Sequence, residues 1–135
     1  MTVADLMVQQ VVKIHPDALL YDAVLEMNKH HVRHLPVVEG EDWLVGIITN
    51  RDIRILATAL PEEDVENGRY SLSLNSRVGE VMTECPIVTE PHVVIEEILD
   101  VFLEEKVGAI PVVEEHKLVG IIGYIDLLTV LRDKL

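Results

Sequence analysis

Two short runs of residues occur twice in this chain, in the same order and at nearly the same spacing. Pro36-Val37-Val38-Glu39 recurs as Pro111-Val112-Val113-Glu114, and Leu44-Val45-Gly46-Ile47-Ile48 recurs as Leu118-Val119-Gly120-Ile121-Ile122. Such self-similarity at a fixed spacing indicates that one structural unit is present twice. The repeats are expected at residues 1–60 and 76–135, joined by a connector at 61–75.

Each repeat has the pattern helix–strand–helix–strand–strand–helix, which predicts an α/β fold. A short helix leads into an extended piece that ends at Pro16 or Pro91, and a strongly periodic helix follows. Two apolar, β-branched strands joined by a tight turn come next, at 35–38 and 43–48 and again at 110–113 and 117–122. A last helix begins at Thr49 in the first repeat. The expected apolar side of the last helix is Ile53, Leu56, Ala57 and Leu60 in the first repeat, and Ile125, Leu128 and Leu131 in the second.

A three-stranded sheet with helices on one face would leave its other face apolar and bare. So small a sheet is not stable with that face in water. We therefore expect the two repeats to pack sheet to sheet about a pseudo-two-fold axis, with clefts where strand ends of one repeat face the other.

Composition excludes several classes of protein. The chain has 135 residues, 49% of them hydrophobic, so it is not intrinsically disordered. The net charge of −13 argues against nucleic acid or an anionic membrane as a partner. No apolar run is long enough to span a membrane, residues 1–15 do not have the pattern of a secretory signal, and there is one cysteine, which together favour the cytoplasm. The charge is uneven, with −3 over residues 1–60 and −10 over 61–135.

The repeated runs resemble a tandem pair of cystathionine β-synthase (CBS) domains, often called a Bateman module. The resemblance covers about residues 2–133, and it includes the strands, the Pro16 and Pro91 turns and the stretches that end at Asp52 and Asp126. It implies a stand-alone, non-catalytic regulatory module that binds an adenosine-containing ligand in the cleft between the repeats. The ligand expected is AMP, ADP or ATP, with NAD and S-adenosylmethionine as alternatives, and no cofactor is required.

In that family the pattern Gly-hydrophobic-hydrophobic-Thr/Ser-x-x-Asp marks the nucleotide site. The first repeat has it complete, with Thr49 and Asp52, whereas the second keeps Asp126 but has Gly123 in the Thr position. A carboxylate one turn into a helix can accept both ribose hydroxyls, and the helix start suits phosphate oxygens. The resemblance also implies that bases before the Pro-Val-Val strand bind phosphate, and that extended backbone lines the adenine pocket. These further candidates are Arg33 and His34 for phosphate and Lys13, Ile14 and His15 for adenine, with 87–89 as the equivalent extended backbone in the second repeat. Arg51 is a candidate for another reason: a cation early in a helix is unfavourable to the helix dipole, which raises the odds that it faces an anion.

Simpler interpretations stay open for several of these residues. Thr49 and Asp52 also form a helix-capping pair, and Arg33 and His34 also fit a solvated helix–strand junction. His30 and His34 have a spacing that metal ligands use on a helix, but we expect the helix to end near His31, so no metal site is predicted.

The protein is expected to form a homodimer through its helices and to act on a regulated protein that the sequence does not identify. The alternative function is a protein–protein interaction or dimerisation module without a ligand. An enzyme has the least support, because no nucleophile–base pair, metal-ligand set or P-loop is recognised. If His34 carries positive charge, ATP binding should tighten as the pH falls from about 8 to about 6.

Overall fold

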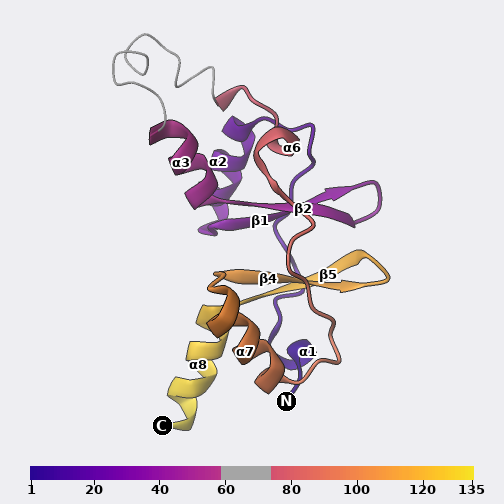
Figure 1. Ribbon diagram of the computed structural model, residues 1–135, viewed down its shortest axis with the longest axis vertical. Coiled ribbons are helices and arrows are strands. Elements are labelled where there is room, and N and C mark those ends of the chain that lie inside the picture. Colours follow the sequence, from indigo (N-terminus) through magenta and orange to yellow (C-terminus); the bar gives the residue numbers. More distant parts are fainter. Residues whose placement is uncertain (59–73) are drawn as a thin grey trace. The chain divides into compact units, whose positions relative to one another are not determined.

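The computed structural model describes residues 1–58 and 74–135 and divides them between two compact units (Figure 1). The first unit contains residues 12–40, 45–58 and 74–85, and the second contains 1–11, 41–44 and 86–135. The units therefore exchange their leading segments, because the start of the chain belongs to the unit that holds the second repeat. Most of the connector expected at 61–75 lies outside the described residues.

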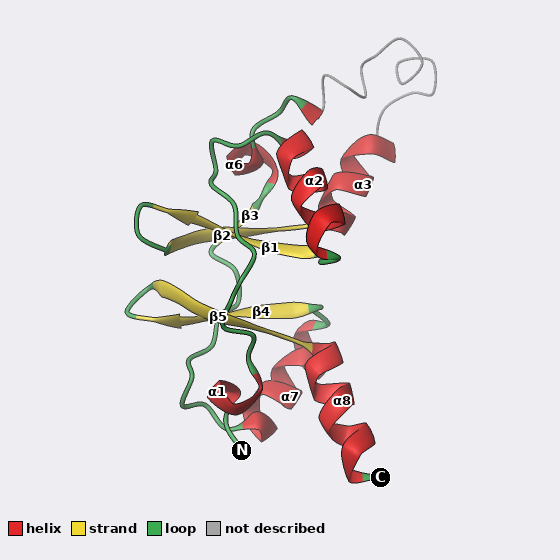
Figure 2. Ribbon diagram, turned by 180° about the vertical axis from the view of Figure 1, so that it is seen from behind, coloured by secondary structure: helices red, strands yellow, loops and turns green. Residues whose placement is uncertain are grey.

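The first unit is built around a β-hairpin covered by helices (Figure 2). Its elements are α2 (Leu20–His30), β1 (His34–Glu39), β2 (Trp43–Thr49, which begins in the second unit), α3 (Asn50–Thr58), α6 (Val78–Val81) and β3 (Thr83–Glu84). Strands β1 and β2 pair with each other, and β3 pairs antiparallel with β2. Gly40 at the hairpin turn has a φ of 52°, which glycine adopts without steric cost.

The second unit repeats this plan. Its elements are α1 (Val3–Leu6), α7 (Ile95–Glu105), β4 (Ala109–Glu114), β5 (Lys117–Gly123) and α8 (Tyr124–Lys134). Strands β4 and β5 are antiparallel, with Ala109 opposite Gly123 at one end and Glu114 opposite Lys117 at the other. Residues 41–44 join this unit, where Trp43 pairs with Lys117 and its ring lies 4.9 Å from that of His116. The mixed α/β fold and the repeated hairpins predicted from the sequence are confirmed.

The extended piece before each long helix is shorter than a full strand. Ile14 forms a parallel bridge with Val37. The N–H of Ile14 donates to the carbonyl oxygen of Pro36 at 3.0 Å, and the N–H of Val38 donates to the carbonyl oxygen of Ile14 at 2.9 Å. Thr89 makes the same bridge to Val112. The pairing cannot extend far, because a proline without an N–H follows two residues after each bridge, at Pro16 and Pro91.

Each unit has its own apolar core. In the first unit, side chains of α2, α3 and both hairpin strands share one buried cluster, of which Leu20, Leu35 and Ile48 are fully enclosed. In the second unit, Val3 of α1 joins Ile98 and Phe102 of α7 in the equivalent cluster. Removing these side chains from water is the main stabilising contribution of each unit.

The face of α8 that we expected to be buried is exposed instead. Ile125, Leu128 and Leu131 all lie at the surface, and the side chain that α8 places in the core is Leu127. On α7, Leu99 and Leu103 are likewise exposed although they belong to the apolar stripe of the sequence. Both helices carry more apolar residues than one core can enclose, so helical periodicity alone does not select the buried face. In the first repeat, Ile53 is buried as expected and Leu60 lies outside the described residues.

Two methionines explain why the second strand of each hairpin, β2 and β5, contains a glycine. A Cβ atom on Gly46 would lie 2.5 Å from Sδ of Met82 and 2.8 Å from the carbonyl oxygen of Thr83. A Cβ atom on Gly120 would lie 2.6 Å from Sδ of Met7. Only a residue without a side chain permits so close an approach. The repeated glycine and methionine therefore form one packing contact, made once in each unit.

Candidate functional site

The start of α3 brings together four of the residues that the sequence singled out. Helix α2 ends at His30, and His31 adopts a left-handed conformation with a φ of 55°, which turns the chain into β1. The carbonyl oxygen of Arg33 then accepts a hydrogen bond of 2.9 Å from the N–H of Asn50. This contact fixes the start of β1, with Arg33 and His34, beside the start of α3, with Thr49 and Asp52.

Thr49 and Asp52 form a reciprocal capping box. The N–H of Asp52 donates to Oγ1 of Thr49 at 3.1 Å, and the N–H of Thr49 donates to Oδ2 of Asp52 at 2.9 Å. The capping interpretation is therefore confirmed as geometry, but it does not use every polar atom. Among the described residues, no hydrogen bond is made by Oδ1 of Asp52, and this oxygen can accept one from a ligand hydroxyl.

Some of the backbone N–H groups at the start of α3 already donate hydrogen bonds within the protein. Those of Asn50 and Asp52 have acceptors within the protein, whereas Arg51 lies between them in the first turn, where an N–H has no partner inside the helix. The side chain of Arg51 is exposed. This helix end offers an anion the positive partial charge of its first turn, the N–H of Arg51 and the exposed guanidinium of the same residue.

His34 is half-buried, and burial lowers the pKa of its imidazole below the ordinary value. The carboxylate of Asp52 opposes this shift and raises the pKa, whereas the charge of Arg33 lowers it further. His34 is thus neutral near pH 7. The expected tightening of ATP binding is therefore displaced toward lower pH, because desolvation disfavours the charged imidazole.

The extended piece at 13–15 lies along the same strand. Ile14 is buried and bridges Val37 of β1, while its neighbours Lys13 and His15 are exposed. The first unit therefore holds Lys13, Ile14, His15, Arg33, His34, Thr49, Arg51 and Asp52. Asp126 belongs to the second unit, where its Oδ2 accepts the N–H of Gly123 at 2.8 Å, the same cap contact without a hydroxyl partner.

The equivalent region of the second unit lacks the bases of the first. Gly108 and Ala109 stand in the positions of Arg33 and His34, and the carbonyl oxygen of Gly108 accepts the N–H of Tyr124 at 3.2 Å. A cavity of about 440 Å³ lies beside the extended piece, with Val88 and Thr89 in its wall and Glu90 and Glu97 among its lining residues. The carboxylates disfavour a phosphate group there. The charge pattern of the sequence hinted at this difference, but the cavity could not be predicted, because it depends on how α7 packs.

A search for metal ligands among residues 1–58 and 74–135 finds no group of three or more His, Cys, Asp or Glu side chains able to hold a metal ion. His30 instead lies 3.3 Å from Glu26 on its own helix. Within the same ranges, no helix combines the length and apolarity needed to cross a membrane.

Comparison with known proteins identifies the fold. The family model of the CBS domain matches the chain twice, at residues 3–57 and 78–133. The chain therefore belongs to the CBS-domain family and carries two of these domains in tandem.

Relatives of two kinds share this pair of domains. The CBS domain-containing protein YhcV of Bacillus subtilis is 30% identical over 126 residues, which cover 93% of this chain and 82% of YhcV. Inosine-5'-monophosphate dehydrogenase of Methanocaldococcus jannaschii is 31% identical over 125 residues, and protein MJ1225 of the same organism is 30% identical over 135. The chain spans only 22% of that dehydrogenase and 48% of MJ1225.

Solved structures agree with this assignment. The crystal structure of MJ1225 has a TM-score of 0.87 and 29% identity, covering 100% of this chain and 51% of that one. A crystal structure of CBSX2, a CBS-pair protein from Arabidopsis thaliana, in complex with AMP has a TM-score of 0.81 and 26% identity, covering 99% and 98% of the two chains.

Proposed function

We propose that this chain is a regulatory module that binds an adenosine-containing ligand, with the ribose and phosphate ends held in the first unit. The observation that carries the proposal is the joining of Arg33 and His34 to Thr49 and Asp52 through the 2.9 Å hydrogen bond between Asn50 and Arg33. The structure of CBSX2 in complex with AMP aligns with this protein over almost all of both chains, and it supports the choice of ligand class.

The residues of the proposed site divide into three groups, for the ribose, the phosphate and the adenine. Asp52 accepts hydroxyl groups of the ribose, while the hydroxyl of Thr49, the amide of Arg51 and the charges of Arg33 and Arg51 bind phosphate. Lys13, Ile14 and His15 line the adenine side. Because the whole protein carries −13, an anionic ligand approaches against a repulsive field and depends on these local cations. The second unit has Gly108, Ala109 and Ile125 in the positions of Arg33, His34 and Arg51, so we propose one phosphate-binding site rather than two.

A thermal-shift screen with AMP, ADP, ATP, NAD and S-adenosylmethionine tests this proposal. A ligand that binds only the folded state raises the free energy of unfolding by RT ln(1 + [L]/Kd), and the midpoint of thermal unfolding rises with it. We expect a concentration-dependent rise with at least one adenosine phosphate. No shift with any of the five at millimolar concentration would leave the alternative, an interaction module without a ligand.

We also propose that the module regulates rather than catalyses, and that it works as a homodimer. The dehydrogenase relative is matched over less than a quarter of its length, so its activity does not extend to this chain by similarity. Dimerisation is supported by the large apolar side chains on the outside of the helices, with Leu103 75% and Ile125 59% exposed. Light scattering should give twice the chain mass of 15.2 kDa.

A further inference from the structure

The cavity of about 440 Å³ in the second unit lies apart from the proposed nucleotide site. All of its lining residues belong to the second unit, in the loop at 88–93, in the first two turns of α7 and at Ile110 of β4. The lining includes neither Ala109 nor Asp126, which correspond to His34 and Asp52 of the nucleotide site. The volume is that of a small-molecule site, so the cavity is a candidate for a different ligand.

The inner wall of the cavity is apolar except for one hydroxyl. Ile98 and Ile110 are 2% and 0% exposed. Thr89 is 7% exposed, and its hydroxyl makes no hydrogen bond within residues 1–58 and 74–135. Every fully enclosed polar side-chain atom of these residues has a partner, so the Thr89 hydroxyl keeps some open surface, and the cavity is the space that Thr89 lines. A ligand in the cavity can donate to this hydroxyl or accept from it.

The first unit shows that the fold does not require a hydroxyl at this position. Ile14, 75 residues earlier, takes the place of Thr89 and makes the same parallel bridge to the neighbouring strand. The side chain of Ile14 is buried in the apolar core of the first unit. The buried hydroxyl of Thr89 therefore lowers the stability of the second unit unless something in the cavity binds it.

The rim of the cavity has a carboxylate that makes no polar contact. In the first unit, Asp22 accepts a hydrogen bond of 3.0 Å at the start of α2. Glu97 has the position of Asp22 in α7, but the start of α7 receives no side-chain hydrogen bond. Among the residues that the structure describes, Glu97 also forms no ion pair. Its carboxylate is available to a ligand.

Two further features of the rim favour a cation with an apolar body. Glu90 lines the cavity as a second carboxylate, with Oε2 lying 3.3 Å from Nδ1 of His92. Val101 also lines the cavity, and it follows Glu97 by four residues, a spacing that makes two side chains neighbours on one helix face. A positive group at Glu97 thus has apolar surface beside it.

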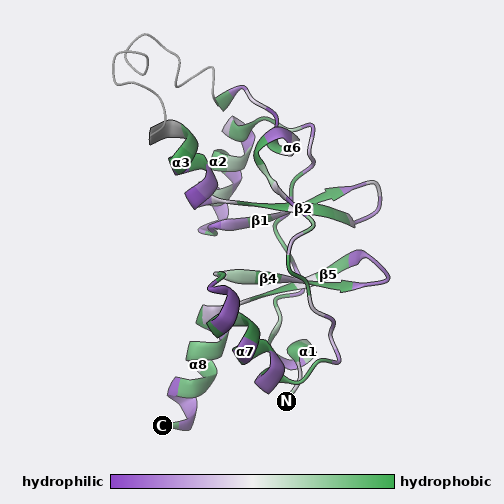
Figure 3. Ribbon diagram, in the orientation of Figure 1, coloured by the Kyte–Doolittle hydropathy of each residue, from purple (hydrophilic) through white to green (hydrophobic). Residues whose placement is uncertain are grey.

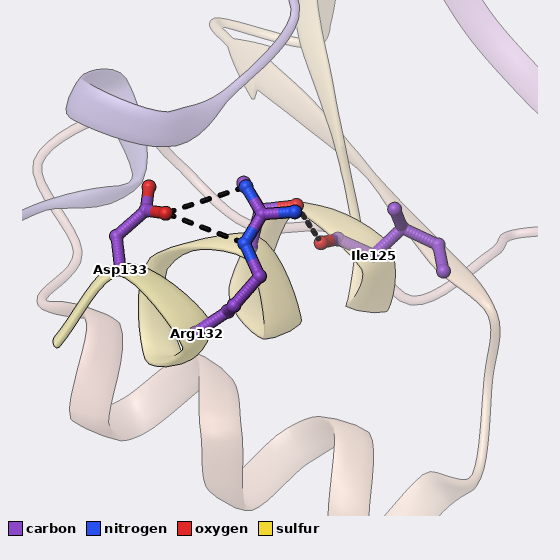
Figure 4. Close-up of polar contacts among 4 residues, drawn as sticks. Ile125, Arg132 and Asp133 are labelled. Carbon is purple, nitrogen blue, oxygen red and sulfur yellow. Dashed lines mark hydrogen bonds and ion pairs between the residues drawn. The ribbon is translucent and has the colours of Figure 1, made fainter. Parts of the chain in front are cut away.

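No lysine or arginine of the second unit neutralises this rim, since none of the four lines the cavity. Lys106 follows the end of α7, about 14 Å along the helix from Glu97. Arg132 of α8 is engaged, because its Nε and Nη2 atoms lie 3.4 and 3.3 Å from Oδ1 of Asp133 (Figure 4). Figure 3 shows hydrophilic segments along α7, whose charged residues are all acids. The cavity therefore lies in a negative field that attracts a cation.

From these observations we infer that the cavity binds a small organic ammonium ion that carries an apolar body and a hydroxyl group. The ammonium group pairs with Glu97, the apolar body lies on Ile98 and Val101, and the ligand hydroxyl forms a hydrogen bond with Thr89. The net charge of −13 attracts such a ligand, whereas it repels the phosphate ligand proposed for the first unit. This inference goes beyond the nucleotide site and does not depend on it.

Three related probes test the two polar contacts separately. Tyramine has an ammonium group, an aromatic ring and a hydroxyl. Phenethylamine lacks the hydroxyl, and tyrosol has a hydroxyl in place of the ammonium group. Each probe is titrated into the isotope-labelled full chain, and the NMR shifts of the Thr89 and Ile98 amides give the location and the dissociation constant. We expect tyramine to shift both amides and to bind at least about threefold more tightly than either of the other probes.

Two substitutions should each remove one of these preferences. Glu97→Gln should abolish the preference for tyramine over tyrosol, and Thr89→Val should abolish the preference for tyramine over phenethylamine. Each variant should keep the other preference. Glu96→Gln is the matched control, because Glu96 is exposed beside Glu97 but does not line the cavity. It should leave all three dissociation constants within about 1.5-fold of wild type.

Several results would overturn the inference. If millimolar tyramine leaves the Thr89 and Ile98 amides unshifted, the cavity holds only water. Equal affinity for the three probes, or equal effects of Glu97→Gln and Glu96→Gln, would show that the polar groups do not select the ligand. AMP should not displace tyramine, because the lining includes no residue of the proposed site in the first unit, and displacement would contradict a separate site. Nucleotide binding is measured by thermal shift, so either proposal can fail alone.

Discussion

Arg33 and Asp52 are connected through the start of α3, where Asn50 contacts Arg33 and Thr49 contacts Asp52. In the proposed site each binds a different part of a nucleotide. The backbone of Arg33 is fixed by Asn50, while its side chain is exposed and able to reach a phosphate group. Asp52 is held at the helix start by its cap contact with Thr49. This division predicts that the two side chains affect different ligands.

Replacing Arg33 with alanine should weaken ATP binding more than adenosine binding. Loss of a charge-assisted hydrogen bond to phosphate costs roughly 1–3 kcal/mol, and adenosine has no phosphate to lose it. Titration calorimetry with both ligands on wild type and Arg33→Ala measures the difference. If both affinities fall by the same factor, Arg33 shapes the pocket without binding phosphate.

His34 predicts a pH dependence of stability. Its pKa is lowered by burial in the folded protein and is about 6.5 in the unfolded chain, so the unfolded chain takes up the proton first. The contribution of neutral His34 to the free energy of unfolding is therefore fully present above about pH 6.5. It is lost as the pH falls from there toward the lower pKa that His34 has in the folded protein. A bound phosphate would favour the charged imidazole and oppose this loss.

Urea unfolding of wild type and His34→Gln at about pH 7.5 and pH 5.5 isolates this effect, because other titrating groups are common to both proteins. Wild type should lose more unfolding free energy than His34→Gln on acidification. An identical loss in both proteins would mean that His34 titrates equally in the folded and unfolded states.

At the scale of elements, the contact between a strand and a methionine predicts a cost for adding one methyl group. Gly46→Ala should lower the free energy of unfolding by about 1–3 kcal/mol, because the new Cβ meets both Met82 and the carbonyl oxygen of Thr83. Gly120→Ala should cost less, because its nearest backbone atom, the carbonyl oxygen of Val8, is 3.1 Å away and Met7 can move. Denaturant unfolding ranks the two, and a smaller loss for Gly46→Ala would contradict the packing contact.

The elements also show what the sequence can and cannot predict. The strands, the hairpins and the Thr49–Asp52 cap are set by residues near one another, so the repeated motifs predicted them correctly. The exposed side of α8 was assigned wrongly, because Ile125 and Leu128 are apolar without being part of the core. Their periodicity is the same whether a helix packs inward or against another chain.

At the scale of the whole molecule, the exchange of leading segments could not be predicted, because it depends on contacts between residues far apart in the sequence. Val3 lies in the core of the second unit and Val78 in that of the first, and both are fully buried. The local sequence around Val3 contains no sign of a partner ninety residues away at Val93, whose carbonyl oxygen accepts its N–H at 2.8 Å.

Valine-to-alanine substitutions test this exchange by hydrogen exchange. Val3→Ala should cost about 1–3 kcal/mol and speed amide exchange in α7 and β5, far from the substitution in sequence. Val78→Ala, the matched variant, should speed exchange in α2 and β1 instead. Faster exchange in α2 on replacing Val3 would contradict the division into units.

Asp52 is proposed to contribute to nucleotide binding beyond its role as a cap. Asp22 provides a control outside the proposed site, because its Oδ2 accepts the N–H of Leu19 at 3.0 Å, the same contact that Asp52 makes with the N–H of Thr49 but without a hydroxyl partner. Asp126→Ala removes the corresponding cap in the second unit.

Calorimetric titration of ATP into wild type, Asp52→Ala, Asp22→Ala and Asp126→Ala is therefore the most direct measurement. We expect micromolar-to-millimolar binding to wild type and a loss of at least about tenfold for Asp52→Ala. Asp22→Ala should change the affinity little, and Asp126→Ala should lower it less than Asp52→Ala does. Equal losses for Asp52→Ala and Asp22→Ala, or no binding to wild type, would contradict the proposed role of Asp52.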